Sequence, residues 1–318
     1  MEESVIYKNG NYLTLIKSNG RGFTKIRRTI KWDDNEFHAE FPDSIDLKIS
    51  NRCSIGCSFC HESSVPNGKI FDLKRTIQVL DKLPKVGIEV AIGGGDIFDC
   101  YDEFKSLNHW LVSNYFLTRV TINEKDLDRP EYDELLQDCS QNISSSIDSI
   151  SIGISLVSNN PPIDKLSNIF HGSFVFHVIA GITPISTLKD LIECVKSSIA
   201  SIKILVLGFK NYGRGKSFNI DLKLMDDWKR EVRSMLYYRS FGESLCLSFD
   251  NLAIEQLEIK DALLDYEWEM CYQGNEFTNT MYVNAVDEFF APTSYSTEKK
   301  SWSEYNSDII KYFNENHN

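Results

Sequence analysis

The chain has 318 residues, of which 42% are hydrophobic and 12% aromatic, and it carries a formal net charge of −12. This length suits one large α/β domain with a small appendage, or two ordinary domains. The negative charge argues against a dedicated nucleic-acid binder, and no apolar run approaches the roughly 20 residues of a membrane span. The chain start lacks a secretory signal and the cysteines form no disulfide framework, so we expect a cytoplasmic protein without membrane or nucleic-acid partners.

Residues 1–43 predict a small β-hairpin or meander ahead of the main domain. Apolar and polar residues alternate over 5–7 and 12–16, with turns at Asn9-Gly10 and Asn19-Gly20. Asn-Gly between alternating runs is a strong hairpin signal. Two interpretations of the basic residues here stay open, a solvated hairpin face or a docking surface for an acidic partner: Lys17, Arg21, Lys25, Arg27, Arg28 and Lys31.

Residues 44–240 follow a regular pattern of strand, loop and helix. Such alternation implies parallel strands with crossover helices, and therefore an α/β fold. The predicted strands lie at 45–49, 89–92, 119–122, 149–156, 174–182 and 202–208, and the helices near 73–83, 103–116, 131–139, 164–170, 188–197 and 225–237.

Three cysteines, Cys53, Cys57 and Cys60, follow the first of these strands in a C-x3-C-x2-C spacing. Three thiolates from one tight loop can bind three irons of a [4Fe–4S] cluster and leave the fourth iron open. The alternative is half of a zinc site, which needs a second Cys/His pair at short spacing. His61 is too close to be independent and Cys100 has no paired partner, so the cluster is favoured.

This spacing, with the aromatic Phe59 before the last cysteine, resembles the signature of the radical S-adenosylmethionine (radical SAM) superfamily. The resemblance implies a partial (β/α)6 TIM-like barrel over 44–240, with its chemistry at the carboxyl ends of the strands. It further implies that the open iron binds S-adenosylmethionine. Electron transfer then gives a 5'-deoxyadenosyl radical that abstracts hydrogen from a substrate. An electron donor of the flavodoxin or ferredoxin type is expected.

The run Gly93-Gly94-Gly95-Asp96 ends the second predicted strand. Glycines let a backbone approach a ligand closely, although the run alone would also fit a tight βα turn. In the resembled family a Gly-Gly-Glu-like motif at this position binds the amino group of S-adenosylmethionine. The shorter Asp96 preserves an acceptor there.

Further cofactor contacts are expected on later strands by the same resemblance. Ser155 stands where the family supplies a polar group to the ribose or carboxylate, although a core serine fits its strand equally. Gly181 and Ile182 match the strand whose backbone lies beside the adenine. His177, inside an apolar strand, is interpreted as structural. The basic loop at 210–216 is either a solvated loop or a mouth loop for a carboxylate or phosphate.

Residues 241–318 lose the alternating pattern and predict a β-rich extension, with strands at 245–249, 252–254, 280–286 and 288–291. The segment from Cys271 through Gly274, followed by 281–290, resembles the start of a SPASM or twitch module. No cysteine follows Cys271, and with Cys246 alone it cannot hold a further cluster in the usual way. A cluster-free remnant of that module and an unrelated β-rich tail both stay open.

The sequence therefore predicts a radical SAM enzyme whose cofactors are a [4Fe–4S] cluster and S-adenosylmethionine. The remnant module favours a peptide or protein side chain as substrate. The basic loops at Arg27-Arg28 and 214–216 would also suit a nucleotide or another phosphorylated small molecule. A non-catalytic, metal-stabilised binding module and a scaffold that has lost catalysis are the remaining alternatives.

Overall fold

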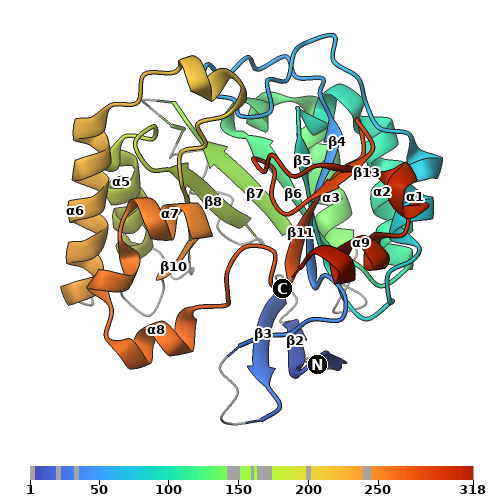
Figure 1. The fold of residues 1–318 in the computed structure, drawn as a ribbon. Coiled ribbons are helices and arrows are strands. Elements are labelled where there is room, and N and C mark those ends of the chain that lie inside the picture. The colour runs from blue at the N-terminus through green and yellow to red at the C-terminus, as the bar shows by residue number, and fades with distance from the viewer. Residues whose placement is uncertain are drawn as a thin grey trace.

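A curved ten-stranded sheet forms the centre of the molecule (Figure 1). The structure is a computed structural model and describes residues 4–18, 23–31, 36–141, 151–158, 161–162, 174–197, 202–238 and 245–317. The sheet contains β4 (Ser44–Ser50), β5 (Glu89–Gly94), β6 (Leu117–Asn123), β7 (Ser151–Leu156), β8 (Phe174–Ile179), β9 (Ile202–Leu207), β10 (Leu245–Phe249), β11 (Thr280–Asn284), β12 (Phe289–Ala291) and β13 (Lys300–Ser301).

The strand order is β10-β9-β8-β7-β6-β5-β4-β11-β12-β13. Strands β4 to β10 are parallel and neighbour one another in chain order, as in a singly wound barrel. Strand β11 is parallel to β4, whereas β12 and β13 turn back antiparallel. The edge strands, β10 and β13, do not pair with each other, so the sheet stays open. The predicted α/β fold with a large parallel sheet is thus confirmed.

Crossover helices cover the outer face of the sheet (Figure 1). On β4 the apolar residues Ile45, Leu47 and Ile49 are fully buried in the main core, whereas Lys48 between them lines a cavity. This period of two places apolar side chains against the helices and polar ones toward the concave face. The helices are α1 (Leu73–Leu80), α2 (Tyr101–Ser113), α3 (Pro130–Gln141), α5 (Ile185–Ser197) and α6 (Leu222–Tyr238).

Two predictions near residue 250 need correction. The strand at 245–249 is β10, and it pairs with β9 in the parallel sheet instead of belonging to the C-terminal extension. The predicted strand at 252–254 lies in a helix, α7 (Asn251–Gln256), because the side chain of Asp250 accepts a hydrogen bond from Ala253 N and caps it. The predicted helix at 164–170, the residues 149–150 and the turn Asn19-Gly20 lie outside the described residues.

A separate three-stranded antiparallel sheet lies at the amino end of β4 (Figure 1, bottom). It is formed by β1 (Ser4–Asn9), β2 (Tyr12–Ser18) and β3 (Phe23–Thr29). Lys25 and Arg27 form buried ion pairs with Asp43, which also accepts a hydrogen bond from Tyr7. Burial opposes ionisation of Asp43, but Lys25 and Arg27 outweigh it and lower the pKa of its carboxyl. Part of the basic stretch therefore anchors this sheet and does not form a solvated or docking face.

The C-terminal extension joins the large sheet through β11 and covers it with aromatic side chains. Phe290, Trp302, Tyr312 and Phe313 are fully buried in the main core. The extension also carries α8 (Asp265–Cys271) and α9 (Ile309–Asn316), and Cys246 and Cys271 are both exposed. Within the described ranges, no helix combines the length and apolarity that a membrane crossing requires.

Candidate functional site

The loop that follows β4 carries all three cysteines of the motif. Cys53, Cys57 and Cys60 are free thiols and each is half-buried. The loop turns at Gly56, whose φ of +72° favours glycine, and Cys60 N donates to Cys57 O at 3.3 Å. Cys53 N donates to Val65 O at 3.0 Å, which fixes the base of the loop. The spacing in the sequence therefore becomes one compact loop at the carboxyl end of β4.

The donor set of this loop, three free thiols, fits a [4Fe–4S] cluster. Burial, with the neighbouring sulfurs, raises the pKa of the thiols of Cys53 and Cys57, and a bound cation would act in the opposite direction and favour the thiolates. Backbone hydrogen bonds from Ile55 and Gly56 to Cys53 act in the opposite direction. In the part of the chain that the structure describes, no three His, Cys, Asp or Glu side chains are placed to hold one metal ion. A [4Fe–4S] cluster does not need that, because each thiolate binds a different iron.

The glycine run at the end of β5 packs directly on the start of the cysteine loop. Gly94 has a φ of +116°, and a Cβ there would lie 2.6 Å from Ser50 O. A Cβ on Gly95 would lie 2.0 Å from Arg52 O. Gly95 N donates to Ser50 O at 2.6 Å, and Asp96 N donates to Arg52 O at 2.9 Å. Both glycines are therefore needed for the close approach of two backbones.

Gly93 and Asp96, at the two ends of this run, differ in what surrounds them. A Cβ on Gly93 would have no atom within 4 Å, so the space beside it is open to a ligand. The side chain of Asp96 is buried, accepts from Phe98 N at 2.9 Å and pairs with Arg129 at 2.7 Å. Of these two, Gly93 is the one that adjoins free space, while Asp96 already has partners for both oxygens.

Arg129, which the sequence analysis did not single out, joins the cysteine loop to the ends of β5 and β6. Its guanidinium pairs with Asp96 at 2.7 Å, Asp126 at 3.0 Å and Asp99 at 3.4 Å. It also donates to the Ser54 hydroxyl at 3.0 Å, and Ser54 N donates to Asp99 at 2.7 Å. The three aspartates are visible in the sequence as acidic loop residues. Their shared partner, Arg129, is revealed only by the structure.

The basic loop after β9 clamps the other side of the cysteine loop. Arg214 Nε donates to Cys57 O at 2.9 Å and its Nη1 donates to Ser64 O at 2.6 Å. Arg214 N donates to Cys60 O at 3.0 Å, and a Cβ on Gly213 would lie 2.4 Å from His61 O. Two nitrogens of the Arg214 guanidinium thus bind backbone carbonyls, whereas its buried Nη2 has no hydrogen-bond partner among the described residues.

Two other predicted residues pack onto neighbouring loops. Phe59 meets Phe218 edge to face, with ring centroids 5.8 Å apart. Gly181 follows β8 with a φ of +76°, and a Cβ there would lie 2.7 Å from the Ile220 side chain. Gly181 is buried and the next residue, Ile182, is half-buried. Gly181 is thus needed for packing, whether or not the adjoining backbone contacts an adenine.

Ser155 lies near the carboxyl end of β7, half-buried and opposite Asn123 and His177 in the sheet register. His177 projects over Gly153, where an added Cβ would lie 2.4 Å from its imidazole. Burial and the charge of Arg119 lower the pKa of His177 to about 4, so this histidine is neutral at pH 7. These residues place polar atoms on the concave face, on the side of β6 away from β4.

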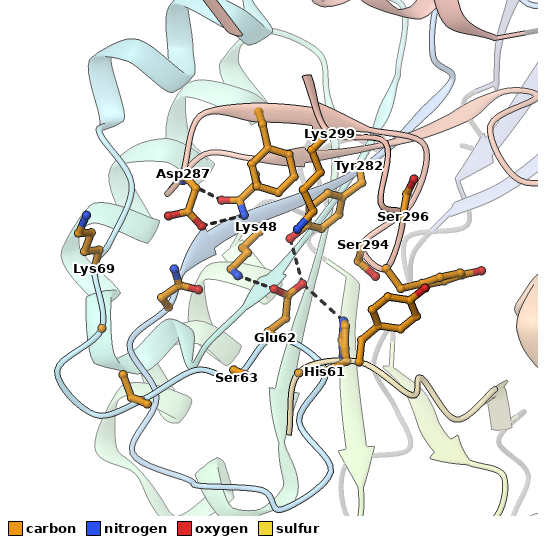
Figure 2. A pocket seen from close by; sticks show the side chains of 18 of the residues that line it. Lys48, His61, Glu62, Ser63, Lys69, Tyr282, Asp287, Ser294, Ser296 and Lys299 are labelled. Carbon is orange, nitrogen blue, oxygen red and sulfur yellow. Dashed lines mark hydrogen bonds and ion pairs between the residues drawn. The ribbon is translucent and has the colours of Figure 1, made fainter. Parts of the chain in front are cut away.

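A buried polar cluster that the sequence analysis missed lies directly after Cys60. Glu62 pairs with Lys48, accepts from the hydroxyl of Tyr282 at 2.9 Å and lies 3.4 Å from His61 Nε2 (Figure 2). Burial acts to raise the pKa of Glu62, but the His61 hydrogen bond and Lys48 lower it to about 2. A lysine within an apolar strand was the available sequence signal. The cluster ties the cysteine loop to β4 and β11.

Comparisons with known proteins bear on the fold. No protein-family model matches the sequence, and no curated protein matches it. The structure of Streptococcus suis SuiB bound to precursor peptide SuiA matches with a TM-score of 0.60 and 14% identity, covering 87% of this chain and 65% of SuiB. The structure of SuiB bound to S-adenosylmethionine matches with a TM-score of 0.59 and 14% identity, covering 87% of this chain and 66% of SuiB.

A second protein of the same fold is anSMEcpe, in its native form with bound AdoMet, that is, S-adenosylmethionine. It matches with a TM-score of 0.53 and 12% identity, covering 80% of this chain and 75% of that one. The present chain spans just under two thirds of the length of SuiB. At these identities the likeness shows a shared fold, and the activity has to be argued from the site.

Proposed function

We propose that this protein is a radical SAM enzyme. The observation that carries the proposal is the direct packing of the cysteine loop on the glycine run, through the bonds from Gly95 N to Ser50 O and from Asp96 N to Arg52 O. Two motifs that one cofactor site would require thus meet at the carboxyl ends of adjacent strands. Two solved structures with the same fold contain S-adenosylmethionine, which supports the same cofactor here.

In this proposal Cys53, Cys57 and Cys60 hold a [4Fe–4S] cluster. When bound, the cluster would supply the one electron that cleaves S-adenosylmethionine to methionine and a 5'-deoxyadenosyl radical for hydrogen abstraction. The open space beside Gly93 receives the methionine end of the cofactor, and Ser155 binds its ribose or carboxylate. An external electron donor of the flavodoxin or ferredoxin type reduces the cluster.

A peptide or protein side chain is the proposed substrate. The fold matches SuiB bound to precursor peptide SuiA and anSMEcpe bound to Cp18Cys peptide. The alternative, a phosphorylated small molecule, drew its support from the basic residues near positions 27 and 214. Arg27 is buried against Asp43, and Nε and Nη1 of Arg214 bind backbone carbonyls, so the support for a phosphate is reduced and rests mainly on the exposed Lys216.

The test is anaerobic reconstitution of the wild type, Cys57→Ala and Cys246→Ala. We expect about four irons and four sulfides per wild-type chain, whereas a zinc module would hold one zinc. Cys57→Ala should lose both the iron and the production of 5'-deoxyadenosine. Cys246→Ala is the matched control, because that exposed cysteine lies on β10 outside the motif. A Cys57→Ala protein that still produces 5'-deoxyadenosine would refute the assignment.

A further inference from the structure

A cavity of about 810 Å³ adjoins the cysteine loop on the side of β4 and β11. Its walls come from three places in the chain: the residues just after Cys60, the loop after β9, and the segment 294–299 of the extension. Its floor is the cluster of Lys48, Glu62 and Tyr282 (Figure 2). A ligand in this cavity would therefore lie beside the loop that holds the proposed cluster.

Two contacts close the cavity on the side of β9. Lys210 Nζ donates to the hydroxyl of Ser294 at 3.0 Å. The rings of Tyr212 and Tyr295 pack against each other with centroids 5.7 Å apart. The segment of the extension that follows β12 thus reaches the loop after β9 across the open side of the sheet. The cavity therefore depends on the C-terminal extension, which supplies part of its wall.

The charged groups that line this cavity are mainly cationic, although the protein as a whole carries a charge of −12. Four lysines face two carboxylates. Lys48 is buried and is paired with Glu62. Lys69, Lys216 and Lys299 are exposed, and no ion pair involves them among the residues that the structure describes. An anionic ligand would therefore find three cations at the rim without having to displace a carboxylate of the protein.

The rim cations are spread out instead of meeting at one point. Lys69 stands on the cysteine loop, Lys216 on the loop after β9 and Lys299 on the extension, and Figure 2 shows Lys69 and Lys299 on different sides of the cavity. The Nζ atom of Lys216 lies 5.7 Å from the ring centroid of Tyr212, and that of Lys299 lies 4.9 Å from the ring centroid of Phe289. Cations on three separate segments match carboxylates spaced along a chain better than one phosphate.

We propose that this cavity binds an acidic segment of the substrate peptide, with its carboxylates at Lys69, Lys216 and Lys299. The assignment rests on the proposed function, because it takes a peptide to be the substrate that must lie next to the cysteine loop. It adds that the peptide is recognised by negative charge next to the residue to be modified.

The test measures anisotropy of two fluorescein-labelled heptapeptides on the reconstituted protein, one with three glutamates and one with glutamines in their place. The glutamate peptide should bind about tenfold more tightly, and added salt should weaken it, because rim charges are screened. The double variant Lys216→Gln/Lys299→Gln should lose most of that preference. The control Lys74→Gln/Lys82→Gln removes the same charge from exposed positions outside the cavity and should retain the preference.

Iron content and the thermal unfolding midpoint of each variant check that the protein is intact. Equal affinity for the two peptides, or an unchanged preference in the Lys216→Gln/Lys299→Gln variant, would overturn the proposal. So would binding of pyrophosphate to this cavity without binding of the glutamate peptide. Production of 5'-deoxyadenosine by the wild type without peptide decides the radical SAM assignment separately, so the two failures are distinguishable.

Discussion

Gly93 and Gly94 are adjacent, yet a methyl group would have opposite effects at the two positions. Gly94→Ala should destabilise the protein by about 1–3 kcal/mol, because its φ of +116° disfavours an L side chain and its Cβ would press on Ser50 O. Gly93→Ala should change the unfolding free energy by less than about 0.5 kcal/mol, because its Cβ meets nothing within 4 Å. Urea unfolding measures both.

Gly93→Ala should instead weaken the binding of S-adenosylmethionine, if the open space beside Gly93 receives the cofactor. Equilibrium dialysis of the reconstituted variant against labelled cofactor measures this effect, with the wild type as reference. Unchanged affinity in Gly93→Ala would mean that the cofactor lies elsewhere. Equal stability of the two variants would contradict the backbone contact between β5 and the cysteine loop.

Asp96 predicts a pH dependence of stability. Burial and the charge of Asp126 raise the pKa of Asp96 to about 7. The folded state then holds a proton that the unfolded state releases at about pH 4, so stability falls as the pH rises from about 4 to 7. The amide of Asp96→Asn does not titrate, so this loss of stability is absent from the variant. The free energy of unfolding of Asp96→Asn, relative to that of the wild type, should therefore rise between about pH 4 and pH 7. Urea midpoints at pH 5 and pH 8 measure the difference, and parallel curves would refute it.

At the residue scale the sequence was sufficient where chemistry and spacing are local. The three cysteines and the glycine run were found from their own neighbours. Arg129 and Arg214 were not, because their partners lie far along the chain; Arg214 and Cys57 are 157 positions apart. Asp96 was predicted as a ligand from its position, and only the structure reveals its bonds to Arg129 and Phe98 N.

At the scale of elements, the loop after β9 is expected to hold the cysteine loop in place. Arg214→Ala removes two hydrogen bonds from a charged donor, each of which contributes about 1.5–3 kcal/mol. The reconstituted variant should therefore lose iron to a chelator at least about tenfold faster than the wild type. Arg230→Ala is the control, because Arg230 is exposed on α6 and pairs only with Asp227 among the described residues.

Absorbance of the released iron–chelator complex follows this loss over time. Equal rates for Arg214→Ala and the wild type would mean that the clamp does not support the bound group. A faster loss in Arg230→Ala as well would point to a general effect of removing charge.

The sequence predicted most elements of the parallel sheet because strand and helix periods alternate clearly there. It failed at 252–254, where a three-residue apolar run does not distinguish a strand from a helix. The preceding Asp250 was the decisive feature, since its side chain caps α7. Strand β10 was found, but its parallel pairing with β9 is a tertiary property that no local pattern contains.

At the scale of the whole molecule, the extension shares the main core with the parallel sheet. Phe290 is fully buried and packs on Tyr312 at 5.1 Å and Trp302 at 5.9 Å between ring centroids. Phe290→Ala should therefore cost about 3–5 kcal/mol and lower the stability of the entire protein in one transition. The unfolding transitions followed by circular dichroism and by tryptophan fluorescence should coincide. An earlier, separate fluorescence transition would support an independent domain at 241–318.

The contacts around the cysteine loop also set an order of events during biosynthesis. Arg214 is added 157 residues after Cys57, and Tyr282 is added 220 residues after Glu62. At about 5–20 residues per second, the ribosome needs on the order of 10–40 s to make the longer stretch. During that time the three thiols emerge on a nascent chain without their clamps. We therefore expect iron loading to follow the completion of translation, and the cysteines to need protection from oxidation until then.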